Sequence, residues 1–184
     1  YLHVKIYKRQ IMKIFISGAN SPLGQYLKKR LRLILNSEIY EGSSRPNSNQ
    51  TEFNIYKQFN FHKIENIDVL IHLACPKNPN EEGLKKELNL LKNFREKGIS
   101  IINIGSVSGC REKPNNYGIY KKEVENWCTA NKETNLRCGL LFGEDFFGQL
   151  FRINRILKYV PIYPVISLSG QVLLTPVEFV LENI

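Results

Sequence analysis

The sequence has no stretch that approaches the roughly 18 consecutive apolar residues that a membrane-spanning helix needs. Lys, Arg, Asn or Glu interrupts every apolar run, which argues against a membrane-spanning protein. Residues 1–11 alternate between basic and apolar, with neither a long apolar core nor the small-residue cleavage site of a signal peptide. We interpret them as a leader that is non-native or disordered, with the fold beginning at Met12.

Cysteine is also sparse. The four cysteines are far apart and form no Cys-x-x-Cys pair, and the histidine nearest to one of them, His72, shares a strand-like run with Cys75. This spacing indicates neither a zinc site nor a disulfide framework, so no metal is expected. His72 is interpreted as a satisfied core residue. Free thiols in a chain without a signal peptide are typical of the reducing cytoplasm.

The net charge of +9 raises the question of a nucleic-acid partner, because clustered Lys and Arg displace counterions from phosphates. The clustering is missing, since most basic residues outside the leader are dispersed among Asn and Glu. A single-strand binder would also interleave aromatic residues with a basic stripe, and none is found outside the leader. No nucleic-acid partner is therefore expected.

Short apolar runs alternate with longer helical patterns, which is typical of a parallel sheet with helices on both faces. This order predicts an α/β, Rossmann-type, doubly wound fold. The predicted strands are Lys13–Ser17, Glu38–Gly42, a weak Glu52–Ile55, Asp68–Ala74, Ser100–Gly105 and Asn135–Leu141. The predicted helices are Pro22–Leu35, Glu81–Lys97, Tyr117–Asn131 and Phe146–Tyr159.

The pattern changes near the end of the chain. Proline, serine and glycine punctuate short apolar pieces after Lys158, before a last predicted helix from Pro176. We therefore expect a Rossmann domain over residues 12–160 and a partial substrate lobe or capping segment over 161–184.

The first predicted strand runs directly into Gly18-Ala19-Asn20-Ser21-Pro22-Leu23-Gly24 and then into a helix. The first glycine permits a tight turn, and the last permits close packing of helix on strand. The free NH groups at the helix N-terminus suit a pyrophosphate. This context predicts a dinucleotide site.

The end of the second strand usually decides between NAD and NADP. Here Ser43 and Ser44 offer neutral hydroxyl donors, and Arg45 offers a charged guanidinium with parallel NH donors, which favours the 2′-phosphate of NADP. Glu41 keeps NAD as the alternative, because an acid at this place can bind the ribose hydroxyls.

Ser106, Tyr117 and Lys121 form the candidate catalytic set. Tyr117 and Lys121 lie four residues apart at the start of a predicted helix, so they share one face. A nearby ammonium favours the phenolate, which allows Tyr117 to act as acid and base near neutral pH. Ser106 follows a buried strand, and the family resemblance given below implies that it would bond the reacting oxygen, with Ser108 in reserve.

Several motifs resemble the extended short-chain dehydrogenase/reductase family, which holds the NAD-dependent epimerases and dehydratases of sugar nucleotides. They occur in the family's order from Met12 to about Gly143. They are Ile71-His72-Leu73-Ala74, Asn89-Leu90-Leu91 with Gly98-Ile99, Ile104-Gly105-Ser106-Val107, Asn116-Tyr117-Gly118-Ile119-Tyr120-Lys121-Lys122-Glu123 and Leu136-Arg137-Cys138-Gly139-Leu140-Leu141-Phe142-Gly143.

The resemblance implies roles for individual residues. Gly18, Asn20, Ser21, Leu23 and Gly24 would line the pyrophosphate. Ala74 would line the adenosine or nicotinamide side, and Lys121 would also hold the nicotinamide ribose. The resemblance further implies a nucleotide-sugar substrate and allows a homodimer.

The chain also departs from the family pattern. Ser21 replaces the middle glycine, Asn54 stands near an expected aspartate, and Gly83 stands where an asparagine is usual. Val107 and Ser108 replace the Asp-Glu pair of the dehydratases, which disfavours dehydration. We therefore expect an epimerase or a reductase. The alternative is a non-catalytic NADP-binding sensor or scaffold with a degenerate substrate lobe.

Overall fold

A six-stranded sheet forms the centre of the protein. The computed structural model describes residues 11–34, 37–64, 66–143, 146 and 173–184. The strand order is β3-β2-β1-β4-β5-β6, and every neighbouring pair is parallel. This confirms the predicted Rossmann-type α/β fold. The strands are β1 (Lys13–Ser17), β2 (Glu38–Ser43), β3 (Thr51–Glu52), β4 (Val69–His72), β5 (Ser100–Ser106) and β6 (Thr134–Cys138).

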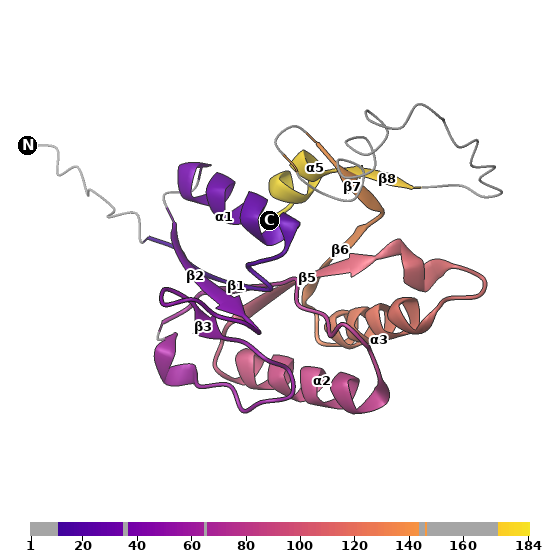
Figure 1. Ribbon diagram of the computed structural model, residues 1–184, viewed down its shortest axis with the longest axis horizontal. Coiled ribbons are helices and arrows are strands. Elements are labelled where there is room, and N and C mark those ends of the chain that lie inside the picture. The colour runs from indigo at the N-terminus through magenta and orange to yellow at the C-terminus, as the bar shows by residue number, and fades with distance from the viewer. Residues whose placement is uncertain (1–10, 35–36, 65, 144–145, 147–172) are drawn as a thin grey trace, which may run out of the picture.

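Helices cover both faces of this sheet. The helices α1 (Pro22–Ile34) and α5 (Val177–Glu182) lie above it in Figure 1, and α2 (Glu81–Glu96) and α3 (Asn116–Ala130) lie below. Successive strand residues point to opposite faces. In β1, Ile14 and Ile16 accordingly pack in the core with α1, whereas Phe15 packs in the core with α2 and α3.

Capping residues fix where the helices begin. The side chain of Asn80 accepts a hydrogen bond from the amide of Gly83 at the start of α2, and Asn115 does the same for Gly118 at the start of α3. Each bond satisfies a helix amide that has no partner within the helix. Pro22 is the first residue of α1, where its missing NH costs nothing.

The strand predicted over Asn135–Leu141 is wrong as a single element. The structure divides it at Gly139 into β6 and β7 (Leu140–Phe142), and β7 pairs with β8 (Leu174–Pro176) in a separate two-stranded sheet. A Cβ at Gly139 would overlap the carbonyl oxygen of Leu173, and the Gly139 amide donates to Thr175 Oγ1 at 2.9 Å. Contact with a distant segment therefore ends β6.

Two other predicted strands are shorter than expected. The weak Glu52–Ile55 strand is reduced to the two residues of β3, because Phe53 and Ile55 turn into the core, and Asp68–Ala74 is reduced to β4. The helix expected from Pro176 is present as α5. The helix expected over Phe146–Tyr159 lies, apart from Phe146, outside the described residues.

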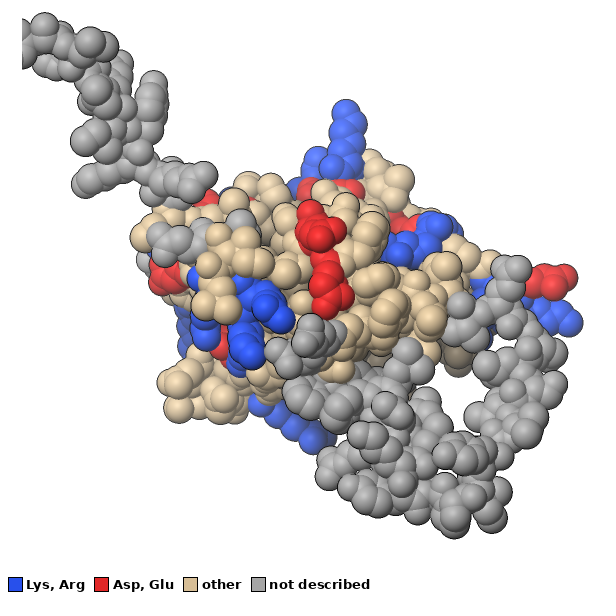
Figure 2. Space-filling model, turned by 90° about the horizontal axis from the view of Figure 1, so that it is seen from above, with Lys and Arg blue, Asp and Glu red and all other residues tan. Residues whose placement is uncertain are grey.

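The described surface mixes charges of both signs. On the face seen in Figure 2, Lys and Arg occur in separate groups with acidic side chains between them. None of the described helices is long and apolar enough to cross a membrane. The described ranges also contain no cluster of three or more His, Cys, Asp or Glu suited to a metal ion.

Candidate functional site

A cavity of ≈ 670 Å³ opens beyond the carboxyl ends of the strands. It lies beside β1 and β4, where the strand order reverses, and ligands of open α/β sheets bind at such a point. Its volume is within the range of ligand pockets. Its wall includes Gly18, Asn20 and Ser21 after β1, Ser43 and Ser44 at the end of β2, and Leu73, Ala74 and Cys75 after β4.

The turn after β1 requires its two glycines. Gly18 has a φ of 72°, in the left-handed region, and a Cβ there would lie 3.1 Å from the backbone nitrogen of Ala74. A Cβ at Gly24 would lie 2.6 Å from the carbonyl oxygen of Gly18. Ser21 Oγ accepts a hydrogen bond from the Gly24 amide at 3.1 Å. Serine therefore caps α1 at the position where the family pattern has its middle glycine.

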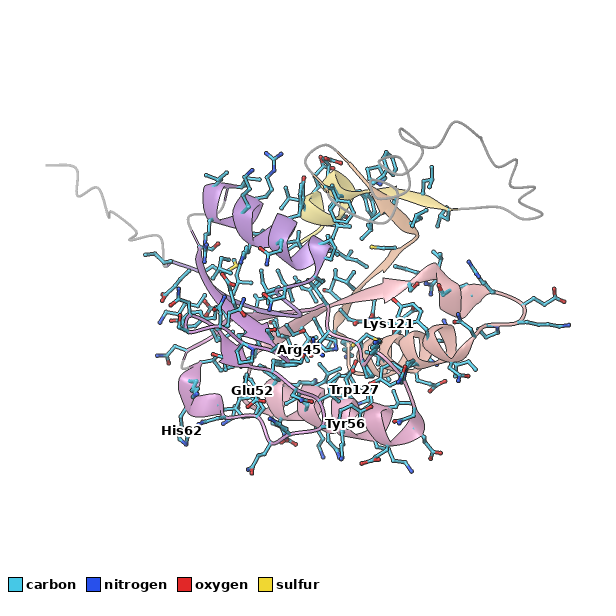
Figure 3. The ribbon with its side chains drawn as sticks, in the orientation of Figure 1. Arg45, Glu52, Tyr56, His62, Lys121 and Trp127 are labelled. Carbon is cyan, nitrogen blue, oxygen red and sulfur yellow. The ribbon has the colours of Figure 1, made fainter. Side chains whose placement is uncertain are left out.

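Not every predicted cofactor residue lines this cavity. Gly18, Asn20, Ser21 and Ala74 do. Leu23 and Gly24 are buried in α1, so a ligand can reach them only through the backbone, and Gly24 acts by close packing. Arg45 lies exposed on the segment that follows β2 (Figure 3), where its carbonyl accepts from Asn20 Nδ2 at 3.3 Å.

Glu41 is engaged away from the cavity wall. Its carboxylate pairs with Lys28 at 2.9 Å and Arg32 at 3.3 Å, and it accepts a hydrogen bond from Gln50 Nε2 at 2.9 Å. Burial raises the pKa of Glu41, but the bond from Gln50 and the attraction of Lys28 outweigh it and hold this pKa below its ordinary value. Gln50 also donates to Asn20 Oδ1 at 2.8 Å, which connects Glu41 to the turn after β1.

The three predicted catalytic residues lie on β5 and α3. Ser106 ends β5, and its Oγ donates to Ser108 Oγ at 3.1 Å and accepts from the Ser108 amide at 3.2 Å. Tyr117, in the first turn of α3, is 38% exposed. Lys121 is 3% exposed, and its Nζ donates to the carbonyl of Ile104 at 3.2 Å. Figure 3 shows Lys121 on α3.

None of these three side chains lines the cavity, but Lys121 acts on its wall electrostatically. Burial raises the pKa of the Cys75 thiol to about 11, and the Lys121 charge opposes that rise. The ammonium is held on Ile104 of β5, the strand that pairs with β4.

Other sequence interpretations concern structural residues. His72 is fully buried, as interpreted. Arg137 of β6, within the Leu136–Gly143 motif, is ion-paired with Glu125 of α3. At Gly83, a Cβ would lie 2.7 Å from the hydroxyl of Tyr56, which is the far end of an exposed side chain.

One buried polar group has no counterpart in the sequence interpretation. Glu87 of α2 is fully buried and contacts His72 and Tyr120. The available signal was its position on the apolar stripe of α2, one turn before Leu90 and Leu91, where an acid is out of place.

Comparison with known proteins gives likeness at the level of fold. No family model and no curated protein matches the chain. Among solved structures, UDP-N-acetylglucosamine 4-epimerase from Bacillus cereus is 19% identical, with a TM-score of 0.58 over 73% of this chain and 55% of that chain. This chain thus spans about half the length of that enzyme.

Two further solved structures cover more of the chain. A variant of UDP-glucuronic acid 4-epimerase from Bacillus cereus, in complex with NAD, is 17% identical, with a TM-score of 0.67 over 94% of this chain and 71% of that one. A nucleoside-diphosphate sugar epimerase from Corynebacterium glutamicum is 12% identical, with a TM-score of 0.69 over 95% and 43%. The chain has the Rossmann-type fold of these epimerases.

Proposed function

We propose that the chain is an NAD(P)-dependent oxidoreductase of the extended short-chain dehydrogenase/reductase family. It would move a hydride between the nicotinamide ring and a carbon bearing a hydroxyl or keto group, by epimerisation or reduction of a nucleotide sugar. The observation that carries this proposal is the cavity at the strand-order reversal, with Gly18, Asn20 and Ser21 of the turn before α1 on its wall. The Gly18 turn follows the carboxyl end of β1 and leads into α1, which is the place where a Rossmann fold holds a pyrophosphate at a helix N-terminus.

The bound cofactor would supply the hydride chemistry, and the side chains would handle the proton. Tyr117 would exchange a proton with the substrate oxygen through its phenol. Lys121, one turn further along α3, would favour the phenolate by its charge. Ser106 would donate a hydrogen bond to the same oxygen, for which its hydroxyl must turn from Ser108 to the substrate.

For the cofactor, we propose a preference for NADP. Ser43 and Ser44 lie on the cavity wall, with Arg45 next along the chain. Glu41 is occupied by Lys28 and Gln50 instead of being free for ribose hydroxyls. Replacing Arg45 by alanine should weaken NADPH binding about tenfold or more and leave NADH binding within about twofold. Equal losses for both nucleotides would contradict this preference.

A spectroscopic assay tests the activity. The protein is incubated with NADP⁺ or NADPH and a panel of UDP- and dTDP-sugars, while nicotinamide absorbance is followed and the sugars are analysed for epimers. Turnover in the wild type that falls by about 10³-fold or more in Tyr117→Phe supports the proposal. A protein that binds NADPH but converts no sugar under these conditions would be the sensor or scaffold instead.

A further inference from the structure

Four buried polar side chains form a continuous hydrogen-bonded chain beneath the cavity. Ser17 ends β1, His72 ends β4, Glu87 lies on α2 and Tyr120 lies on α3. The first three are 0% exposed and Tyr120 is 3% exposed. Ser17 Oγ lies 2.9 Å from His72 Nδ1, His72 Nε2 lies 2.9 Å from Glu87 Oε1, and the Tyr120 hydroxyl donates to Glu87 Oε2 at 2.6 Å.

Counting hydrogens fixes the direction of these bonds. Ser17 Oγ accepts from the amides of Leu73 at 3.1 Å and Ala74 at 3.3 Å, which uses both of its lone pairs. Its own hydrogen therefore goes to His72 Nδ1, which accepts it, so the ring hydrogen is on Nε2, facing Glu87. Burial and the negative charge of Glu87 raise the pKa of Tyr120 far above its ordinary value, so the phenol keeps its proton and donates.

One end of this hydrogen-bonded series meets the cavity wall, and the other end lies on the helix that carries two of the predicted catalytic residues. Leu73 and Ala74 form part of the cavity wall, and Gly18 packs directly on Ala74. At the other end, Tyr120 is the neighbour of Lys121 on α3, the helix that also carries Tyr117. A buried acid with two donors and no exposed surface is costly unless all its partners are kept, so this arrangement tolerates few alternatives.

We propose that Glu87 is a positioning residue: through His72 and Ser17 it holds the Leu73–Ala74 wall against the Gly18 turn, and through Tyr120 it holds α3 in register with that wall. The effect of this role on nucleotide binding rests on the proposed function, in which the cavity holds the cofactor. Loss of these hydrogen bonds would displace the wall against which a dinucleotide binds, without removing any group that touches the dinucleotide.

The test uses three variants of the full chain. Glu87→Met removes the acceptor and leaves His72 Nε2 without a partner. Glu87→Gln is the conservative variant: its amide oxygen can still accept from His72 Nε2, and its NH₂ can donate to the Tyr120 oxygen once the phenol hydrogen turns away. Leu91→Ala is the control. This buried residue of the same helix takes no part in the hydrogen bonds among Ser17, His72, Glu87 and Tyr120, and its truncation lowers the stability of the whole protein.

Two readouts are taken at a temperature at which circular dichroism shows every variant folded. The first is the hydrogen-exchange rate of the Leu73 and Ala74 amides relative to that of Ile71 in β4. The second is the Kd for NADPH. Glu87→Met should raise the exchange ratio and the Kd, each by about tenfold or more, because the wall is displaced. Glu87→Gln should stay within about threefold of the wild type, and Leu91→Ala should leave both quantities unchanged.

An unchanged exchange ratio in Glu87→Met would overturn the proposal. So would a Kd that rises as much in Leu91→Ala as in Glu87→Met, since affinity would then follow overall stability. If the wild type binds neither NADPH nor NADH, the proposed function fails, and the exchange ratio alone still decides whether Glu87 positions the wall.

Discussion

Replacing Gly24 by alanine should destabilise the protein and impair nucleotide binding together. The added Cβ would lie 2.6 Å from the carbonyl oxygen of Gly18 and 2.8 Å from the Cα of Ala19, both of which are backbone atoms. Because backbone cannot give way as a flexible side chain can, α1 must move away from the turn. Overpacking of this kind costs about 1–3 kcal/mol. In a domain of this size that lowers Tm by roughly 2–12 °C.

Gly98→Ala provides the matched control. Gly98 has a φ of 77° after α2, and a Cβ there would meet nothing within 4 Å. Its replacement costs about 1–2 kcal/mol through backbone conformation alone. Both variants are measured by differential scanning calorimetry and by NADPH titration. Gly24→Ala should lose most of its affinity, whereas Gly98→Ala should bind like the wild type at a comparable Tm. Equal affinities in the two variants would refute the assignment of the Gly18–Gly24 turn to the cofactor.

The remaining predictions concern titration and thiol reactivity. The hydrogen bond from Arg137 holds the pKa of Glu125 below its ordinary value, so the stabilisation is present above the unfolded pKa of about 4.3 and is lost as pH falls through the folded pKa. Urea midpoints should therefore fall less between neutral pH and about pH 3 in Glu125→Gln than in the wild type; equal falls would contradict this. Burial raises the pKa of Cys75 to about 11, whereas Cys110 is exposed, so peptide mapping after brief iodoacetamide treatment at neutral pH should show Cys110 modified first. NADPH should slow the later labelling of Cys75, which lines the cavity, and unchanged labelling would argue against a ligand there.

The sequence pattern predicts those parts of the fold that local residues determine. β1 and β5 are apolar runs buried on both faces, and Pro22 and Gly24 give the start of α1 by their own geometry. The break at Gly139 is different, because it depends on Leu173 and Thr175, which are distant in the chain. Such a contact cannot be predicted from the local preferences of the residues around Gly139.

In the candidate site, too, local residues determine some features and distant contacts determine others. The turn after the first strand predicts Gly18, Asn20 and Ser21, the family resemblance adds Ala74, and all four line one cavity. Side-chain direction was not predictable: Leu23 faces the core, and Glu41 turns to Lys28 and Arg32 on α1. Glu87 was missed because its partners come from β4 and α3, and only the folded chain brings them together.

A nucleotide titration tests the central claim most directly. Nicotinamide fluorescence is followed as the purified wild type, Gly18→Asp and Tyr117→Phe are titrated with NADPH and with NADH. Gly18→Asp would place a charged side chain against the Ala74 backbone at a position with a positive φ, whereas Tyr117 lies outside the cavity wall. Saturable binding that is abolished in Gly18→Asp and kept in Tyr117→Phe is the predicted result. Binding of neither nucleotide to the wild type would contradict the oxidoreductase proposal and leave this chain with the fold alone.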